Sequence, residues 1–81
     1  MLDKRSESYR HFCEVRWLLR KIAAAKTPKT AADQYIADVR KARGDTSADT
    51  LLRVTRKAWA KGLRGAEEPI ESAYQDFLKI V

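Results

Sequence analysis

Apolar side chains recur at helical spacing along most of the chain, and breaks in this pattern divide it into four segments. The segments cover about residues 6–26, 28–43, 47–61 and 69–80. In the first segment the apolar positions share one helical face, and they are Phe12, Val15, Leu18, Leu19 and Ile22. Strand-like alternation is absent. The pattern therefore predicts an all-α fold, a small bundle of three to four helices joined by short loops, within a single domain of residues 1–81.

Proline, glycine and capping residues mark the expected helix ends. Pro28 suits the first turn of a helix, and Thr27 precedes it as a candidate N-cap. Gly44 suits a helix end because glycine tolerates positive φ. The run 46–49, Thr-Ser-Ala-Asp, resembles a capping box and places the next helix start near Ser47. Pro69 is expected to open the last helix.

Composition and charge restrict the class of protein. The chain has 81 residues, 17 of them Lys or Arg against 11 acids, and a net charge of +6. No apolar run approaches the roughly 20 residues that span a bilayer. The start, Met1 to Arg5, is charged and leads into no apolar segment, so we expect no secretory signal. One cysteine fits a reducing compartment. We expect a basic cytoplasmic protein that does not enter a membrane.

The side chains that enzymes need are scarce. The single His11 and the single Cys13 are two positions apart on a helix, so their side chains diverge. The carboxylates are scattered, and the three glycines fall at expected helix ends rather than in a phosphate loop. The sequence predicts no enzyme, no cofactor and no metal site.

A second line of side chains on the first helix is a candidate binding surface. Tyr9, Cys13 and Trp17 follow one another at four-residue spacing. Aromatic rings beside arginine are typical of binding hot spots. The predicted partner-binding residues are Tyr9, Arg10, Arg16, Trp17 and Arg20. The alternative is that the first helix is central and buried on two sides, with Cys13 as a small core residue.

The third helix carries a basic stripe opposite its apolar face, and no acid occurs between Asp49 and Glu67. Such a stripe could contact phosphates, with affinity that falls steeply with salt. The candidate phosphate-binding residues are Arg53, Arg56, Lys57, Lys61 and Arg64. The alternative is an ordinary solvated helix face. Charge is unevenly distributed, since residues 67–81 hold four acids and one Lys. The acidic last helix is therefore expected either to pair with the basic remainder of the chain or simply to pack on the core.

Three stretches of sequence together resemble an uncharacterised family of small helical proteins encoded by phages and prophages of proteobacteria. They are residues 8–16 (SYRHFCEVR), Arg43-Gly44 and residues 59–62 (WAKG), and Cys13-Glu14-x-Arg16 is the most distinctive piece. The likeness covers about Glu7 to Gly65. The chain departs from the pattern at Phe12, at the longer junction 26–29 and in an added tail from Glu67. The resemblance implies a phage context and no activity that carries over.

These observations lead to one expected function and two alternatives. Small non-enzymatic phage proteins often bind and block a host machine, so we expect a protein that modulates a host or phage complex, such as an anti-defence inhibitor of the anti-CRISPR type. The first alternative is a nucleic-acid-binding accessory protein that uses the basic stripe. The second is a homodimer that closes Trp17 and Cys13 across a two-fold axis.

Overall fold

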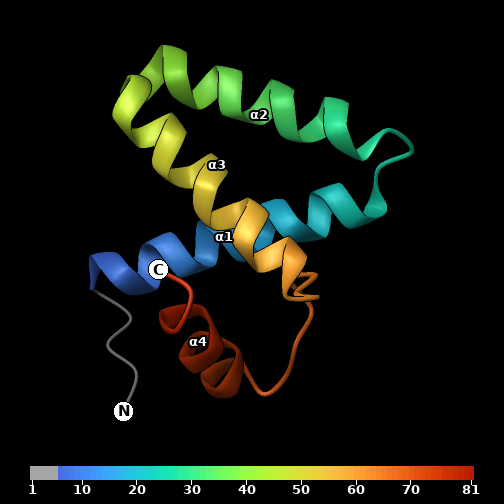
Figure 1. The fold of residues 1–81 in the computed structure, drawn as a ribbon, viewed down its shortest axis with the longest axis vertical. Helices are drawn as coiled ribbons and strands as arrows, with labels where there is room; N and C mark the ends of the chain where they lie inside the picture. The colour runs from blue at the N-terminus through green and yellow to red at the C-terminus, as the bar shows by residue number, and fades with distance from the viewer. Residues whose placement is uncertain (1–5) are drawn as a thin grey trace.

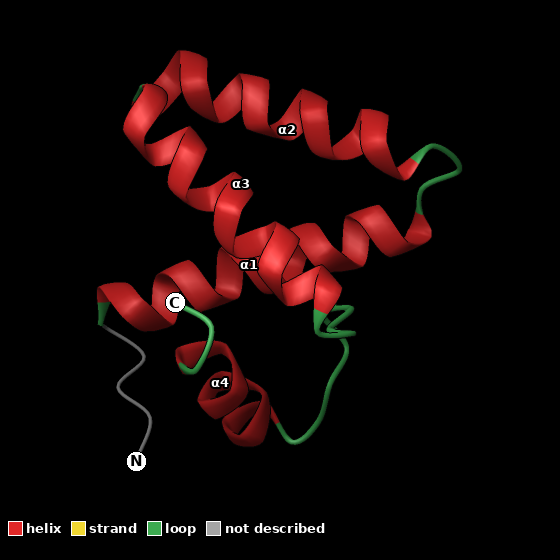
Figure 2. Cartoon of the chain, in the orientation of Figure 1, coloured by secondary structure: helices red, strands yellow, loops and turns green. Residues whose placement is uncertain are grey.

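The computed structural model describes residues 6–81, and these residues form four α-helices and no strand (Figures 1 and 2). The helices are α1 (Glu7–Ala24), α2 (Pro28–Arg43), α3 (Asp45–Ala60) and α4 (Ile70–Leu78). The predicted all-α bundle is confirmed. None of the helices in residues 6–81 has the length and apolar character that crossing a membrane requires.

Helix α1 is the centre of the bundle, because the other three helices all pack on it. Figure 1 shows α2 on one side of α1 and α4 on the other, with α3 crossing it. The apolar stripe predicted from the sequence is buried, and Val15 and Leu18 are each only 1% exposed. The Ser6 side chain caps the start of α1, where Tyr9 N–H donates to Ser6 Oγ at 3.1 Å. The helix ends at Ala24, two residues before the predicted end.

Helices α2 and α3 form a tight hairpin with Gly44 as its only connecting residue. Gly44 has φ +95° and ψ 172°, a backbone region that only glycine occupies readily. The predicted helix start at Ser47 and its capping box are wrong, since α3 already begins at Asp45 and has no side-chain cap. Arg40 of α2 instead binds Asp45 and Asp49 of the first turns of α3, at 2.9 and 2.8 Å.

The end of α3 turns the chain toward α1. Leu63 N–H donates to Ala58 O and Gly62 N–H to Trp59 O, both at 3.0 Å, which is the pattern of a Schellman motif. Beyond it, Gly65 presses on α1. A Cβ atom at Gly65 would lie 2.2 Å from the carbonyl oxygen of Arg16, and the φ of Gly65 is +86°. Only glycine can therefore bring the connecting loop this close to α1.

Helix α4 is held on α1 by aromatic packing. Phe77 is 2% exposed and lies 5.4 Å from the Phe12 ring, while Tyr74 lies 5.5 Å from Tyr9 in an edge-to-face arrangement. Among the described residues, no ion pair within 4 Å joins α4 to the basic body. Of the two roles considered for the acidic last helix, the structure shows core packing. The helix starts at Ile70, one residue after Pro69.

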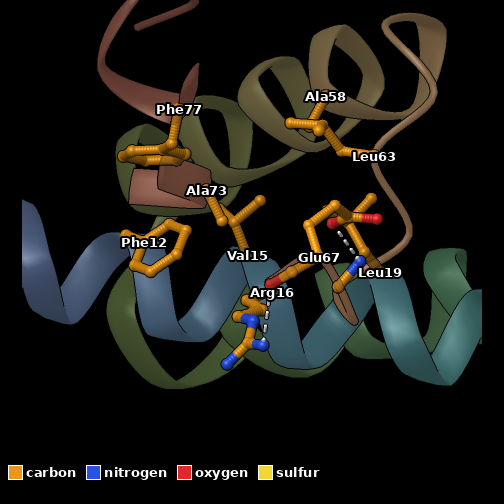
Figure 3. A pocket seen from close by; sticks show the side chains of 10 residues that line it. Phe12, Val15, Arg16, Leu19, Ala58, Leu63, Glu67, Ala73 and Phe77 are labelled. Carbon is orange, nitrogen blue, oxygen red and sulfur yellow. Dashed lines mark hydrogen bonds between the residues drawn. The ribbon is translucent and has the colours of Figure 1, made fainter. Parts of the chain in front are cut away.

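The contact between α1, α3 and α4 leaves almost no empty space. A void of about 10 Å³ lies there, at the lower limit for a single water molecule. In Figure 3 the apolar side chains of α1 face those of α3 and α4, and Arg16 lies at the edge. This interior is filled by its own side chains, so the functional residues must be sought on the surface.

Candidate functional site

Trp17 is the large aromatic side chain that the fold leaves most open to solvent. It is 43% exposed, although it belongs to the central helix. Its ring nevertheless has fixed neighbours: the Tyr35 ring of α2 lies 5.1 Å away, and Lys21 Nζ stands 4.9 Å from the ring centroid. The exposed tryptophan is therefore held from two helices, and its orientation is set before any partner arrives.

The exposed side chains around Trp17 define what we call the Trp17 surface, which consists of Arg10, Cys13, Trp17, Arg20 and Lys21. An open hollow lies beside it. Arg20 and Lys21 line this hollow together with three alanines, which are Ala24, Ala25 and Ala31. The Trp17 surface thus combines an aromatic ring, three cations and an adjoining open hollow partly lined by alanines.

A carboxylate behind Trp17 ties α1 to α2. Glu14 accepts a hydrogen bond of 2.7 Å from the Tyr35 hydroxyl and forms an ion pair with Arg43 at 2.5 Å. Burial alone would raise the pKa of Glu14, but the hydrogen bonds from Arg43 and Tyr35 outweigh it and lower that pKa. Burial and the bond to Glu14 raise the pKa of the Tyr35 hydroxyl. Glu14 is therefore charged at neutral pH and fixes the ring on which Trp17 rests.

Two of the five predicted partner-binding residues do not lie on an exposed face. Tyr9 is 8% exposed and belongs to the aromatic contact with α4, so its expected place on a free surface is wrong. Arg16 is half-buried and donates to the carbonyl oxygen of Glu67 at 3.2 Å. Both side chains turn toward α4 and its loop. The structure leaves Arg10, Trp17 and Arg20 exposed as predicted.

The sequence reasoning missed the residues that fix Trp17. Lys21 could have been found, because it follows Trp17 by four positions and shares its helix face. Tyr35 and Arg43 lie on another helix, and only the packing of α2 on α1 brings them to Glu14. No local pattern in the sequence reports such a long-range contact.

His11 and Cys13 take different environments. Cys13 is exposed, so its expected place in the core under the alternative is wrong, although α1 is central as that alternative stated. His11 is half-buried beside Phe77, and burial lowers its pKa, with a smaller contribution from Arg43. Within residues 6–81, no three His, Cys, Asp or Glu side chains gather in a way that could hold a metal ion.

The predicted basic stripe on α3 is exposed, with one exception. Arg53, Arg56, Lys57 and Lys61 reach solvent, and we call these four residues the basic face. Arg64 is half-buried instead. Its guanidinium covers the Trp59 ring at 3.5 Å and donates to Trp59 O and Leu63 O at 3.0 and 2.9 Å. Arg64 thus closes the end of α3 and does not extend the basic face.

The similarity of this chain to other proteins identifies a family but no activity. The model of a family of unknown function, DUF7696, matches residues 2–62, and the chain belongs to this family. This agrees with the expected membership of an uncharacterised family. Neither the curated proteins nor the solved structures include a significant match. The match ends just after α3, so the loop and α4 lie outside it.

Proposed function

We propose that this chain is a non-catalytic binding protein that docks on another protein through the Trp17 surface. One observation carries the proposal: a half-exposed tryptophan is held in place by Tyr35 and Lys21. Tryptophan and arginine dominate binding energy at protein interfaces. A side chain that is already ordered loses little conformational entropy on binding. Trp17 therefore has the properties of an anchor residue.

The charges around Trp17 indicate the chemistry of the partner. Arg10, Arg20 and Lys21 are exposed, and none of them makes an ion pair within 4 Å with another described residue. The hollow beside Trp17 is lined by three alanines together with Trp17, Arg20 and Lys21. An acidic protein surface with a projecting apolar side chain would complement this arrangement.

We propose that the partner is a host or phage complex in the bacterial cytoplasm. More specifically, we propose that the chain inhibits a host defence complex, as anti-CRISPR proteins do. This part rests on the resemblance to phage and prophage proteins and on the Cys13-Glu14-x-Arg16 pattern. Two residues of that pattern have defined places, since Cys13 belongs to the Trp17 surface and Glu14 supports it. Arg16, the third residue of the pattern, turns instead toward the loop before α4.

The test is capture of a partner from lysate of the host with tagged protein, with nuclease and at low and high salt. We expect one stoichiometric protein that survives nuclease and high salt. Trp17→Ala and Arg20→Glu should each release it, whereas Lys41→Glu, an exposed change on α2, should not. Retention of the partner by both Trp17 surface variants, with the fold intact by circular dichroism, would overturn the choice of surface.

Two further measurements separate the specific forms of this function. Sedimentation at micromolar concentration distinguishes a monomer from a homodimer that closes Trp17 and Cys13 across a two-fold axis. A plaque assay on hosts with and without an active defence system tests the anti-defence form. We expect the wild-type protein to restore plaques on the defended host and Trp17→Ala to lose this effect. Equal plaquing with and without the protein would contradict it.

A further inference from the structure

The C-terminal half of α3 and the end of α4 together form a concentrated positive surface. Lys57 lies in the last turn of α3, Lys61 directly follows the end of that helix, and Lys79 follows the end of α4. All three line one open hollow of about 460 Å³, together with Ala60 and Ile80 and without an acidic side chain. Lys79 is the one basic residue of the acidic segment 67–81. The fold places this residue beside the two lysines of α3.

These lysines have no anionic partner in the described chain. The three ion pairs in residues 6–81 involve Arg40 and Arg43, and none involves Lys57, Lys61 or Lys79. The C-terminal dipoles of α3 and α4 favour cations near Lys57, Lys61 and Lys79. These dipoles do not account for the meeting of the two helix ends in one hollow, or for Arg53 and Arg56, which continue the exposed positive charge along α3. Such a surface attracts anions. Binding of a polyanion to it is favoured further because the polyanion releases its own counterions.

We propose that Lys57, Lys61 and Lys79 form a binding site for the phosphates of double-stranded nucleic acid, which Arg53 and Arg56 extend along α3. The chemistry of the face supports backbone contact rather than base stacking. Trp59 is the one aromatic residue of α3, and the Arg64 guanidinium already covers its ring at 3.5 Å. Stacking of unpaired bases needs open aromatic rings. The hollow offers lysine ammonium groups, which act as point charges for phosphate.

This site is separate from the Trp17 surface and does not depend on the proposed docking function. It differs from the stripe predicted from the sequence in two residues. Lys79 joins it because α4 packs against the bundle, and Arg64 leaves it because its guanidinium is engaged with Trp59 and Leu63.

The test is fluorescence anisotropy of the full chain with a labelled duplex DNA of about 20 base pairs, measured across a range of salt concentrations. We expect binding that weakens linearly in a log–log plot against salt, with a slope that falls by about one for each phosphate contact removed. The double variant Lys57→Glu/Lys61→Glu should lose affinity by about tenfold or more at low salt, and Lys79→Ala by about two- to threefold. The matched control is Lys26→Glu/Lys41→Glu, which changes net charge equally at exposed positions outside the site.

The outcomes decide the proposal in both directions. A loss confined to the variants of Lys57, Lys61 and Lys79 supports it. Equal loss in the matched control would show attraction by net charge alone and would overturn it. Absence of duplex binding at low salt, or binding to vesicles of anionic phospholipid without binding to duplex, would also overturn it. Circular dichroism of each variant verifies that the helices are retained, as expected for changes at exposed positions.

Discussion

The Trp17 surface and the basic face of α3 both present cations, but the two regions place them in different electrostatic surroundings. Behind the Trp17 surface, Glu14 joins Tyr35 and Arg43 in one network that spans α1 and α2. On the basic face no described acid pairs with Arg53, Arg56, Lys57 or Lys61. Charges that are paired inside the molecule fix its shape, whereas unpaired charges are available to an external anion. The two regions thus differ in the paired Glu14 network and not in their exposed cations, since Arg10, Arg20 and Lys21 also make no ion pair with a described residue.

The largest effect on stability is expected in the loop that connects α3 to α4, because this loop positions α4 and Lys79 beside the basic face. Gly65→Ala places a Cβ 2.2 Å from the Arg16 carbonyl oxygen and holds alanine at φ +86°. We expect a loss of about 2–4 kcal/mol in the free energy of unfolding, from strain and from the steric overlap together. Urea denaturation measures it.

The control for this loop is Gly62→Ala. Gly62 also has a positive φ, +91°, but nothing lies within 4 Å of the added Cβ. Only the backbone strain of about 1 kcal/mol should remain. If both variants lose the same stability, the close approach of the loop to α1 is not what holds α4 in place.

The next effect concerns the network behind Trp17. Glu14→Ala removes the acceptor of both Tyr35 and Arg43. We expect a loss of about 1–2 kcal/mol, because three hydrogen bonds to an ionised carboxylate are lost, two of them from the Arg43 guanidinium. The exposed pair of Arg40 and Asp45 is the control, and Asp45→Ala should cost less than about 1 kcal/mol. Equal costs would mean that the Trp17 surface is no more rigid than an ordinary surface ion pair.

The same network gives the two regions a different response to acid. Hydrogen bonds from Arg43 and Tyr35 outweigh the effect of burial and lower the pKa of Glu14, and His11 nearby acts in the same direction. A lowered pKa in the folded state contributes stability above the unfolded value of about 4.5, and this is lost as the pH falls through the folded value. The difference in urea midpoint between wild type and Glu14→Gln should therefore shrink between pH 7 and pH 3.

Glu67 is a second carboxylate whose pairing should make the free energy of unfolding depend on pH. Burial would raise its pKa, but the backbone N–H groups of Arg64 and Gly65 donate to its carboxylate and lower it. Glu67→Gln should show the same shrinking difference in acid. Lys57→Ala should instead parallel wild type over this pH range, because a lysine stays protonated throughout it. A constant difference for Glu14→Gln at all pH values would contradict the paired state of this carboxylate.

Local features of the fold can be predicted from the sequence, whereas features that depend on long-range contacts cannot. The apolar stripe from Phe12 to Ile22 and the proline at the start of α2 are local signals, and the fold follows them. The start of α3 was misplaced because a salt bridge from Arg40 of α2, and not a side chain of its own first turn, supports Asp45. Tyr9 was misplaced because its burial depends on α4, more than 60 positions away. Lys79 was missed on the basic face for the same reason.

The smallest effect on stability is expected on the basic face itself. Lys57→Ala and Lys61→Ala remove exposed side chains that have no ion pair with any described residue. Each should change the free energy of unfolding by no more than about 0.5 kcal/mol. The informative quantity is the salt dependence of the melting temperature. Salt screens the repulsion among Lys57, Lys61 and Lys79, so wild type should gain stability as salt is added, and each variant should gain less.

Arg43→Ala provides the opposite case, because salt screens an attraction there. In that variant the loss of stability relative to wild type should be largest at low salt. The salt dependence of stability should therefore change in opposite directions in the two regions. Removing an unpaired cation relieves repulsion, whereas removing a paired cation abolishes attraction. A loss of more than about 1 kcal/mol in Lys57→Ala, without salt dependence, would instead make that lysine part of the structure and weaken its assignment to an external anion.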